Sequence, residues 1–103
     1  MTIDEFMQLM ESETCPSSLP DMIQALWYAK KGDWKTAHEI VQNANDVKSA
    51  WVHAYLHRQE EDLSNARYWY RRAGKPEFKA GLDQEWEQIV STLLTKVSAQ
   101  EQR

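Results

Sequence analysis

The sequence is poor in the residues that break or cross-link a chain. Its 103 residues include one cysteine, three glycines and three prolines. A single cysteine excludes an internal disulfide. All-β folds need a turn roughly every 8–12 residues, which so few glycines and prolines do not supply. The sequence therefore predicts an all-α protein, and its length suits one domain spanning 1–103.

Long apolar runs and early basic residues are also missing. The longest stretch without Asp, Glu, Lys or Arg, 49–57, is far shorter than the roughly 20 apolar residues of a membrane-spanning helix. No Lys or Arg precedes Lys30, so the basic start of a signal or transit peptide is lacking. We therefore expect a cytoplasmic protein with no membrane partner.

Basic residues are concentrated in one later segment. The formal net charge of −4 argues against nucleic acid as a partner. Between Leu63 and Ala80, however, the only acid is Glu77, and the basic residues are Arg67, Arg71, Arg72, Lys75 and Lys79. This segment is either a solvated face or a patch for an acidic partner, and the sequence leaves both interpretations open.

Apolar residues recur at helical spacing, and no segment shows the alternation typical of strands. About six helices are predicted. The first starts at a capping box of Thr2 and Glu5 and ends near Glu13. The others cover Asp21 to about Lys31, Trp34–Ala44, Val47–Glu60, Leu63–Ala73, and a long last helix capped by Asp83. The apolar stripe of the last helix comprises Leu82, Trp86, Ile89, Val90, Leu93, Leu94 and Val97.

The middle of the chain contains an internal repeat. A shift of 29 residues aligns the units 22–44 and 51–73. The identical pairs are Ala25 with Ala54, Asp33 with Asp62, Ala37 with Ala66, and Ala44 with Ala73. Small residues at helical spacing allow two helices to approach closely. Each unit is therefore predicted to be a helical hairpin with an aspartate capping its second helix.

The first unit resembles a tetratricopeptide (TPR) or Sel1-like repeat. The resemblance rests on Ala25, Tyr28, Gly32, Asp33, Trp34, Ala37, Val41 and Ala44. The second unit is similar, but has His57 in place of an aromatic residue and Glu61 in place of glycine. The stretch 51–76 also resembles a small, mainly bacterial family without an established activity. Two TPR-like hairpins would need the first and last helices as caps.

The repeat resemblance implies that the first helix of each hairpin lines a concave surface. In the second unit that face would carry Lys48, Trp51, Tyr55 and Arg58. Aromatic rings and basic groups in this arrangement suit a peptide or protein segment. The alternative is that the N-terminal helix covers Trp51 and Tyr55.

Two histidines lie one helical turn apart. His53 and His57 at this spacing present both imidazoles on one side, which suits two metal ligands. A third ligand would come from His38 or Asp46. The alternative is that both histidines are half-buried structural residues. No glutamate follows the first histidine, so the zinc-protease motif is absent.

No motif of a known enzyme mechanism occurs, because the glycines at 32, 74 and 81 are isolated and no nucleophile motif is present. We therefore expect a non-catalytic helical-repeat module, without a cofactor, that binds a peptide or protein partner. The alternative function is a small-ligand or metal-binding protein that uses His53 and His57. A homodimer through the last helix is a further expectation.

Overall fold

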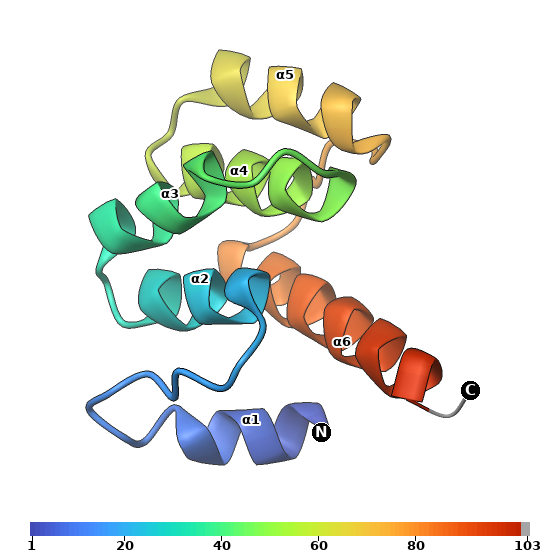
Figure 1. Ribbon diagram of the computed structural model, residues 1–103. Coiled ribbons are helices and arrows are strands. Elements are labelled where there is room, and N and C mark those ends of the chain that lie inside the picture. The colour runs from blue at the N-terminus through green and yellow to red at the C-terminus, as the bar shows by residue number, and fades with distance from the viewer. Residues whose placement is uncertain (102–103) are drawn as a thin grey trace.

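The computed structural model describes residues 1–101, and side chains through Thr95 (Figure 1). Val97, the last residue of the predicted stripe, lies outside the described side chains. The six helices are α1 (Ile3–Leu9), α2 (Asp21–Lys30), α3 (Trp34–Gln42), α4 (Val47–Gln59), α5 (Leu63–Ala73) and α6 (Leu82–Glu101). No strand occurs in this part of the chain. The predicted all-α fold with six helices is confirmed.

The first helix is shorter than predicted. The capping box forms, with the Glu5 amide donating to Thr2 Oγ1 and the Thr2 amide to Glu5 Oε1. The α-helix ends at Leu9 rather than near Glu13. The amides of Glu11 and Ser12 instead donate to carbonyls three residues back, which tightens the chain into turns and stops the α-helical ladder.

The last helix begins differently from the prediction. It starts at Leu82, so Asp83 lies inside the first turn and is not the cap. The Gly81 amide donates to the Gln84 side chain at 3.0 Å, and this contact occupies one of the free donors of the first turn. Asp83 pairs instead with Lys30 Nζ at 3.1 Å.

The two predicted hairpins have the same turn geometry. Asp33 and Asp62 cap α3 and α5 as predicted, with nearly equal backbone angles (φ −97°, ψ 71° and φ −92°, ψ 77°). The residues before them, Gly32 and Glu61, both have positive φ, 89° and 64°. In both turns the aspartate amide donates 2.9 Å to a carbonyl five residues back. The 29-residue sequence repeat is therefore also a repeat of backbone geometry.

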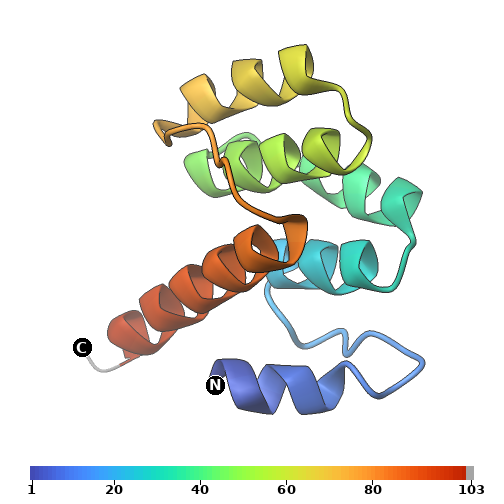
Figure 2. The ribbon, with the colours of Figure 1, turned by 180° about the vertical axis from the view of Figure 1, so that it is seen from behind.

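The hairpins stack in chain order, and α6 crosses beside them (Figures 1 and 2). Packed pairs include α2 with α3, α3 with α4, and α4 with α5. Ala25, Ala37, Ala54 and Ala66 are all buried, which allows close approach of the helices.

The two terminal helices pack on each other, and α6 also packs on the first helix of each hairpin. Helix α6 contacts α2 and α4, and α1 lies against α6 with Phe6 stacked on Trp86 at 5.9 Å. The apolar stripe of α6 from Trp86 to Leu94 is buried inside the single chain. A homodimer through α6 stays a prediction.

Among the described residues, no helix combines the length and apolar character that crossing a membrane requires.

Candidate functional site

The four residues predicted to bind a partner do not form an open face. Trp51 is 6% exposed and Tyr55 2% exposed. Lys48 and Arg58 are partly buried. The Lys75 ammonium lies 4.2 Å from the centre of the Trp51 ring. Partner binding through these four residues stays a prediction, but it lacks the exposed aromatic surface on which it was based.

The cover over this face comes from the C-terminal part of the chain. Helix α1 packs on α6 and not on α4, so the alternative that the N-terminal helix covers Trp51 and Tyr55 is wrong. Arg58 donates instead to the carbonyl of Ala80 at 2.6 Å and lies 5.6 Å from the Phe78 ring centre. The reason is the left-handed turn at Gly74, where α5 ends and from which the chain returns across α4 to start α6.

A buried carboxylate on α6 was not anticipated from the sequence. Glu85 is 1% exposed and accepts from Arg58 Nη1 at 2.7 Å and from the Tyr70 hydroxyl. It therefore joins α4, α5 and α6. In the sequence Glu85 looks like an ordinary first-turn acid, and only the partners from other helices reveal its role.

The structure brings His38 together with His53 and His57. His38 Nε2 of α3 lies 3.0 Å from His53 Nε2 of α4. One ring nitrogen from each of the three side chains falls within 4.8 Å of the others. Asp46, the other predicted third ligand, is exposed and caps α4 by accepting from the Ser49 amide at 2.8 Å.

Flat aromatic side chains hold the three imidazoles. Trp69 of α5 stacks on His53 with ring centres 3.9 Å apart, and His57 also stacks on His53, with ring centres 4.9 Å apart. Trp34 of α3 stacks on His38 at 4.5 Å. The indole of Trp34 also donates to the Leu56 carbonyl at 2.7 Å, which fixes its plane. Ring orientation in the cluster is thus set by both hairpins.

Burial keeps part of the cluster uncharged. Desolvation lowers the pKa of His53 to about 4, with smaller contributions from the neighbouring His57 and His38. Desolvation also lowers the pKa of His38 below its ordinary value. Both imidazoles are therefore neutral near pH 7, the form in which histidine ligates a metal.

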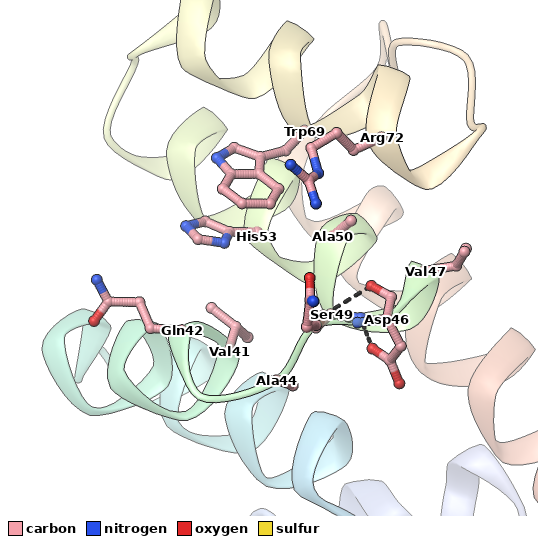
Figure 3. A pocket seen from close by; sticks show the side chains of 11 residues that line it. Val41, Gln42, Ala44, Asp46, Val47, Ser49, Ala50, His53, Trp69 and Arg72 are labelled. Atoms are coloured by element: carbon pink, nitrogen blue, oxygen red, sulfur yellow. Dashed lines mark hydrogen bonds between the residues drawn. The ribbon is translucent and has the colours of Figure 1, made fainter.

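A cavity of about 420 Å³ opens beside the cluster, between α3, α4 and α5 (Figure 3). His53 belongs to its wall. Trp69 and Arg72 reach into it from α5, and Ser49 and Asp46 lie on the opposite side. Its lining residues are Val41, Gln42, Ala44, Asn45, Asp46, Val47, Ser49, Ala50, His53, Trp69 and Arg72.

Arg72 has a defined position at this cavity. Its Nη1 donates to the Tyr68 hydroxyl at 3.1 Å, and its guanidinium carbon lies 5.3 Å from the Trp69 ring centre. Tyr68 and Arg72 lie one helical turn apart on α5, the spacing at which two side chains of a helix meet. The sequence did not indicate that Trp69 and Arg72 would border a cavity with the first hairpin.

The sequence matches no protein-family model, and comparisons with curated proteins and with solved structures likewise return no match. The functional interpretation therefore depends on the geometry described above, which offers two features: a mixed polar and apolar cavity, and a cluster of converging imidazoles.

Proposed function

We propose that this protein is a non-catalytic helical-repeat module that binds an acidic peptide segment of a protein partner. The observation that carries this proposal is the cavity between α3, α4 and α5, which both hairpins line and which Arg72 borders. Stacked helical hairpins form concave surfaces of the kind that repeat proteins use for binding. The proposed binding surface is therefore the cavity beside Trp69, and not the α4 face around Trp51 that the sequence indicated.

The guanidinium of Arg72 favours an acidic group in the ligand. One of its N–H groups is used by Tyr68, and the guanidinium has five donors in all. The remaining donors suit a carboxylate, which arginine binds with two parallel hydrogen bonds. Because Tyr68 and Trp69 already hold the side chain, less conformational entropy is lost on binding.

The rest of the cavity suits a peptide. Gln42 and Asn45 offer side-chain amides, which can both donate to and accept from a peptide backbone. The Asp46 carboxylate on the far side accepts from the Ser49 amide, and its negative charge directs an acidic ligand group toward Arg72. Trp69 supplies apolar area for a side chain of the peptide.

Selection from a phage-displayed library of random peptides against the full chain tests this proposal. Enriched peptides should contain Asp or Glu, and Arg72→Glu should weaken their binding by at least about tenfold, because a charged hydrogen bond contributes about 1.5–3 kcal/mol. Arg71→Glu is the matched control, since Arg71 is an exposed neighbour on the same helix that does not line the cavity. Equal loss in both variants, or no enriched acidic peptide, would contradict the proposal.

A further inference from the structure

All three histidines of this chain lie in one cluster. The sequence contains no other histidine, yet one comes from the first hairpin and two from the second. Two are buried, and His38 is half-buried, which leaves the cluster one edge toward solvent. We propose that His38, His53 and His57 bind a divalent transition-metal ion of the zinc type. This site shares His53 with the wall of the cavity, but it does not depend on the proposed peptide function.

The distances are close to those of a metal site. With Zn–N bonds of about 2.0–2.1 Å, two ligands of a tetrahedral zinc lie about 3.3 Å apart. His38 Nε2 and His53 Nε2 are 3.0 Å apart, and all three ligating nitrogens lie within 4.8 Å. Side-chain shifts of about an ångström would therefore complete the three-imidazole arrangement.

Packing alone does not account for this convergence. Stacking on Trp34 and Trp69 needs flat rings, which phenylalanine or tyrosine would also provide. A contact between two Nε2 atoms at 3.0 Å instead needs one of them to carry a proton and the other to accept it. A metal ion would replace that proton and use the lone pairs of both imidazoles.

Glu60 provides the outer partner that metal-binding histidines usually have. Its Oε1 lies 3.2 Å from His57 Nδ1. When Nδ1 carries the proton and donates to this carboxylate, Nε2 is left as the ligating atom. A carboxylate in this position sets the tautomer and the ring orientation of the ligand. Glu60, at the C-terminal end of α4, and His57 thus form a carboxylate–histidine pair, and Nε2 of His57 is free to ligate the proposed metal ion.

The donor set defines the class of metal. Imidazoles suit zinc, copper and nickel, whereas Mg²⁺ and Ca²⁺ prefer oxygen ligands. Three protein ligands leave a fourth position for water or for another ligand. Because the ligands come from α3 and α4, a bound ion would also cross-link the two hairpins.

Calorimetric titration of the metal-free full chain with Zn²⁺ is the first experiment. The expected result is saturable binding of one ion per chain. His38→Gln should abolish it at concentrations that saturate the unchanged protein, and the half-buried position of His38 favours retention of the fold, which circular dichroism checks. Arg71→Glu, at an exposed position of α5 that does not line the cavity, should leave the metal isotherm unchanged.

Two matched controls test the details. Glu60→Gln should weaken Zn²⁺ binding by about 10–100-fold, as expected for an outer partner of a ligand, whereas Glu61→Gln at the exposed neighbouring position should not. Cys15 is the only thiol in the chain and therefore the only sulfur that could bind Zn²⁺ in place of the imidazoles. Cys15→Ser should leave binding intact, because the proposed ligands are the three histidines.

A measurement on the unchanged protein keeps the proposal testable without variants. Added Co²⁺ below one equivalent should broaden or shift the imidazole proton signals of all three histidines together. Absence of saturable binding with Zn²⁺, Ni²⁺ and Cu²⁺ would overturn the proposal. So would binding that survives His38→Gln unchanged or disappears in Cys15→Ser.

Discussion

Arg58 and Glu85 form an ion pair with 2.7 Å between Nη1 and Oε1, and its carboxylate is almost completely shielded from water. Glu85 also accepts from the Tyr70 hydroxyl, so the carboxylate has partners on both helices of the second hairpin. Arg58 in turn donates to the Ala80 carbonyl just before α6. Charged groups, and not apolar contacts alone, therefore attach the last helix to the repeat.

Removal of this buried carboxylate should be costly. Glu85→Ala leaves Arg58 without its charge partner and should lower the free energy of unfolding by about 3–5 kcal/mol. Asp83→Ala is the matched control on the same helix as Glu85. Asp83 pairs with Lys30 of α2 but is 88% exposed, so its loss should cost less than about 1 kcal/mol. Urea denaturation followed by circular dichroism measures both, and equal losses would contradict the role of burial.

The two hairpin turns offer a reciprocal test. Glu61 has positive φ, so Glu61→Gly should relieve about 1–2 kcal/mol of steric cost. The greater conformational entropy of glycine in the unfolded chain offsets about 0.5–1 kcal/mol of this, which leaves a net stabilisation of up to about 1.5 kcal/mol. Gly32→Ala should lower the stability by about 1 kcal/mol, because alanine is disfavoured at the φ of 89°. A steric clash adds nothing to this cost, since a Cβ at position 32 meets no atom within 4 Å. Thermal melting of both variants should show opposite shifts, and shifts of the same sign would refute the equivalence of the turns.

Two buried tyrosines should make the protein sensitive to high pH. Burial raises the pKa of Tyr55 and of Tyr70 well above the ordinary value near 10, and the hydrogen bond to Glu85 adds to the shift at Tyr70. The Glu85 charge also raises the pKa of both tyrosines, and the Asp83 charge that of Tyr55, whereas Arg58 lowers both.

The sign follows from proton linkage. Above pH 10 or so the unfolded chain releases phenol protons that the folded chain keeps, so stability is complete below this pH and falls as the pH rises. In this pH range each tyrosine should lower the free energy of unfolding by about 1.4 kcal/mol for each unit by which the pH rises. Tyr55→Phe should flatten the decline measured by denaturation between pH 9 and 11. Tyr68→Phe, at a 42% exposed position, should leave it unchanged, and an unaltered slope in Tyr55→Phe would count against this account.

Two tryptophans differ in their hydrogen bonding and provide a matched pair. Trp86 is fully buried and its Nε1 donates to the Leu26 carbonyl at 2.8 Å. Trp27 is nearly as buried, but its Nε1 has no hydrogen-bond partner among the described residues. Trp86→Phe should therefore destabilise the protein by about 1 kcal/mol more than Trp27→Phe, the typical net contribution of a hydrogen bond. Equal effects in chemical denaturation would show that the indole hydrogen bond is unimportant.

Local signals in the sequence predicted most of the fold. Asp33, Asp62 and Gly74 mark helix ends because a capping carboxylate or a left-handed glycine acts within a few residues of its own position. The errors lie where distant groups compete. Asp83 can cap a helix, but Lys30, far away in the sequence, offers it a salt bridge, and Gln84 satisfies the Gly81 amide instead.

The candidate sites were predictable only in part. The spacing of His53 and His57 follows from the helical period alone, and His38 was one of two possible third partners. The cavity beside Trp69 and Arg72 was not predicted, because it lies between hairpins whose packing the sequence pattern does not specify. The same holds for the cover over Trp51, which depends on the direction of the chain after Gly74.

Local signals along the chain specify six helices, their main caps, and two hairpin turns that share one geometry. These features depend on contacts between residues close in the chain. The packing of the helices places Trp51 and Tyr55 in the core, buries Glu85 against Arg58, and brings His38 into contact with His53. Each of these outcomes needs groups on different helices to approach, and no helical periodicity encodes which faces meet.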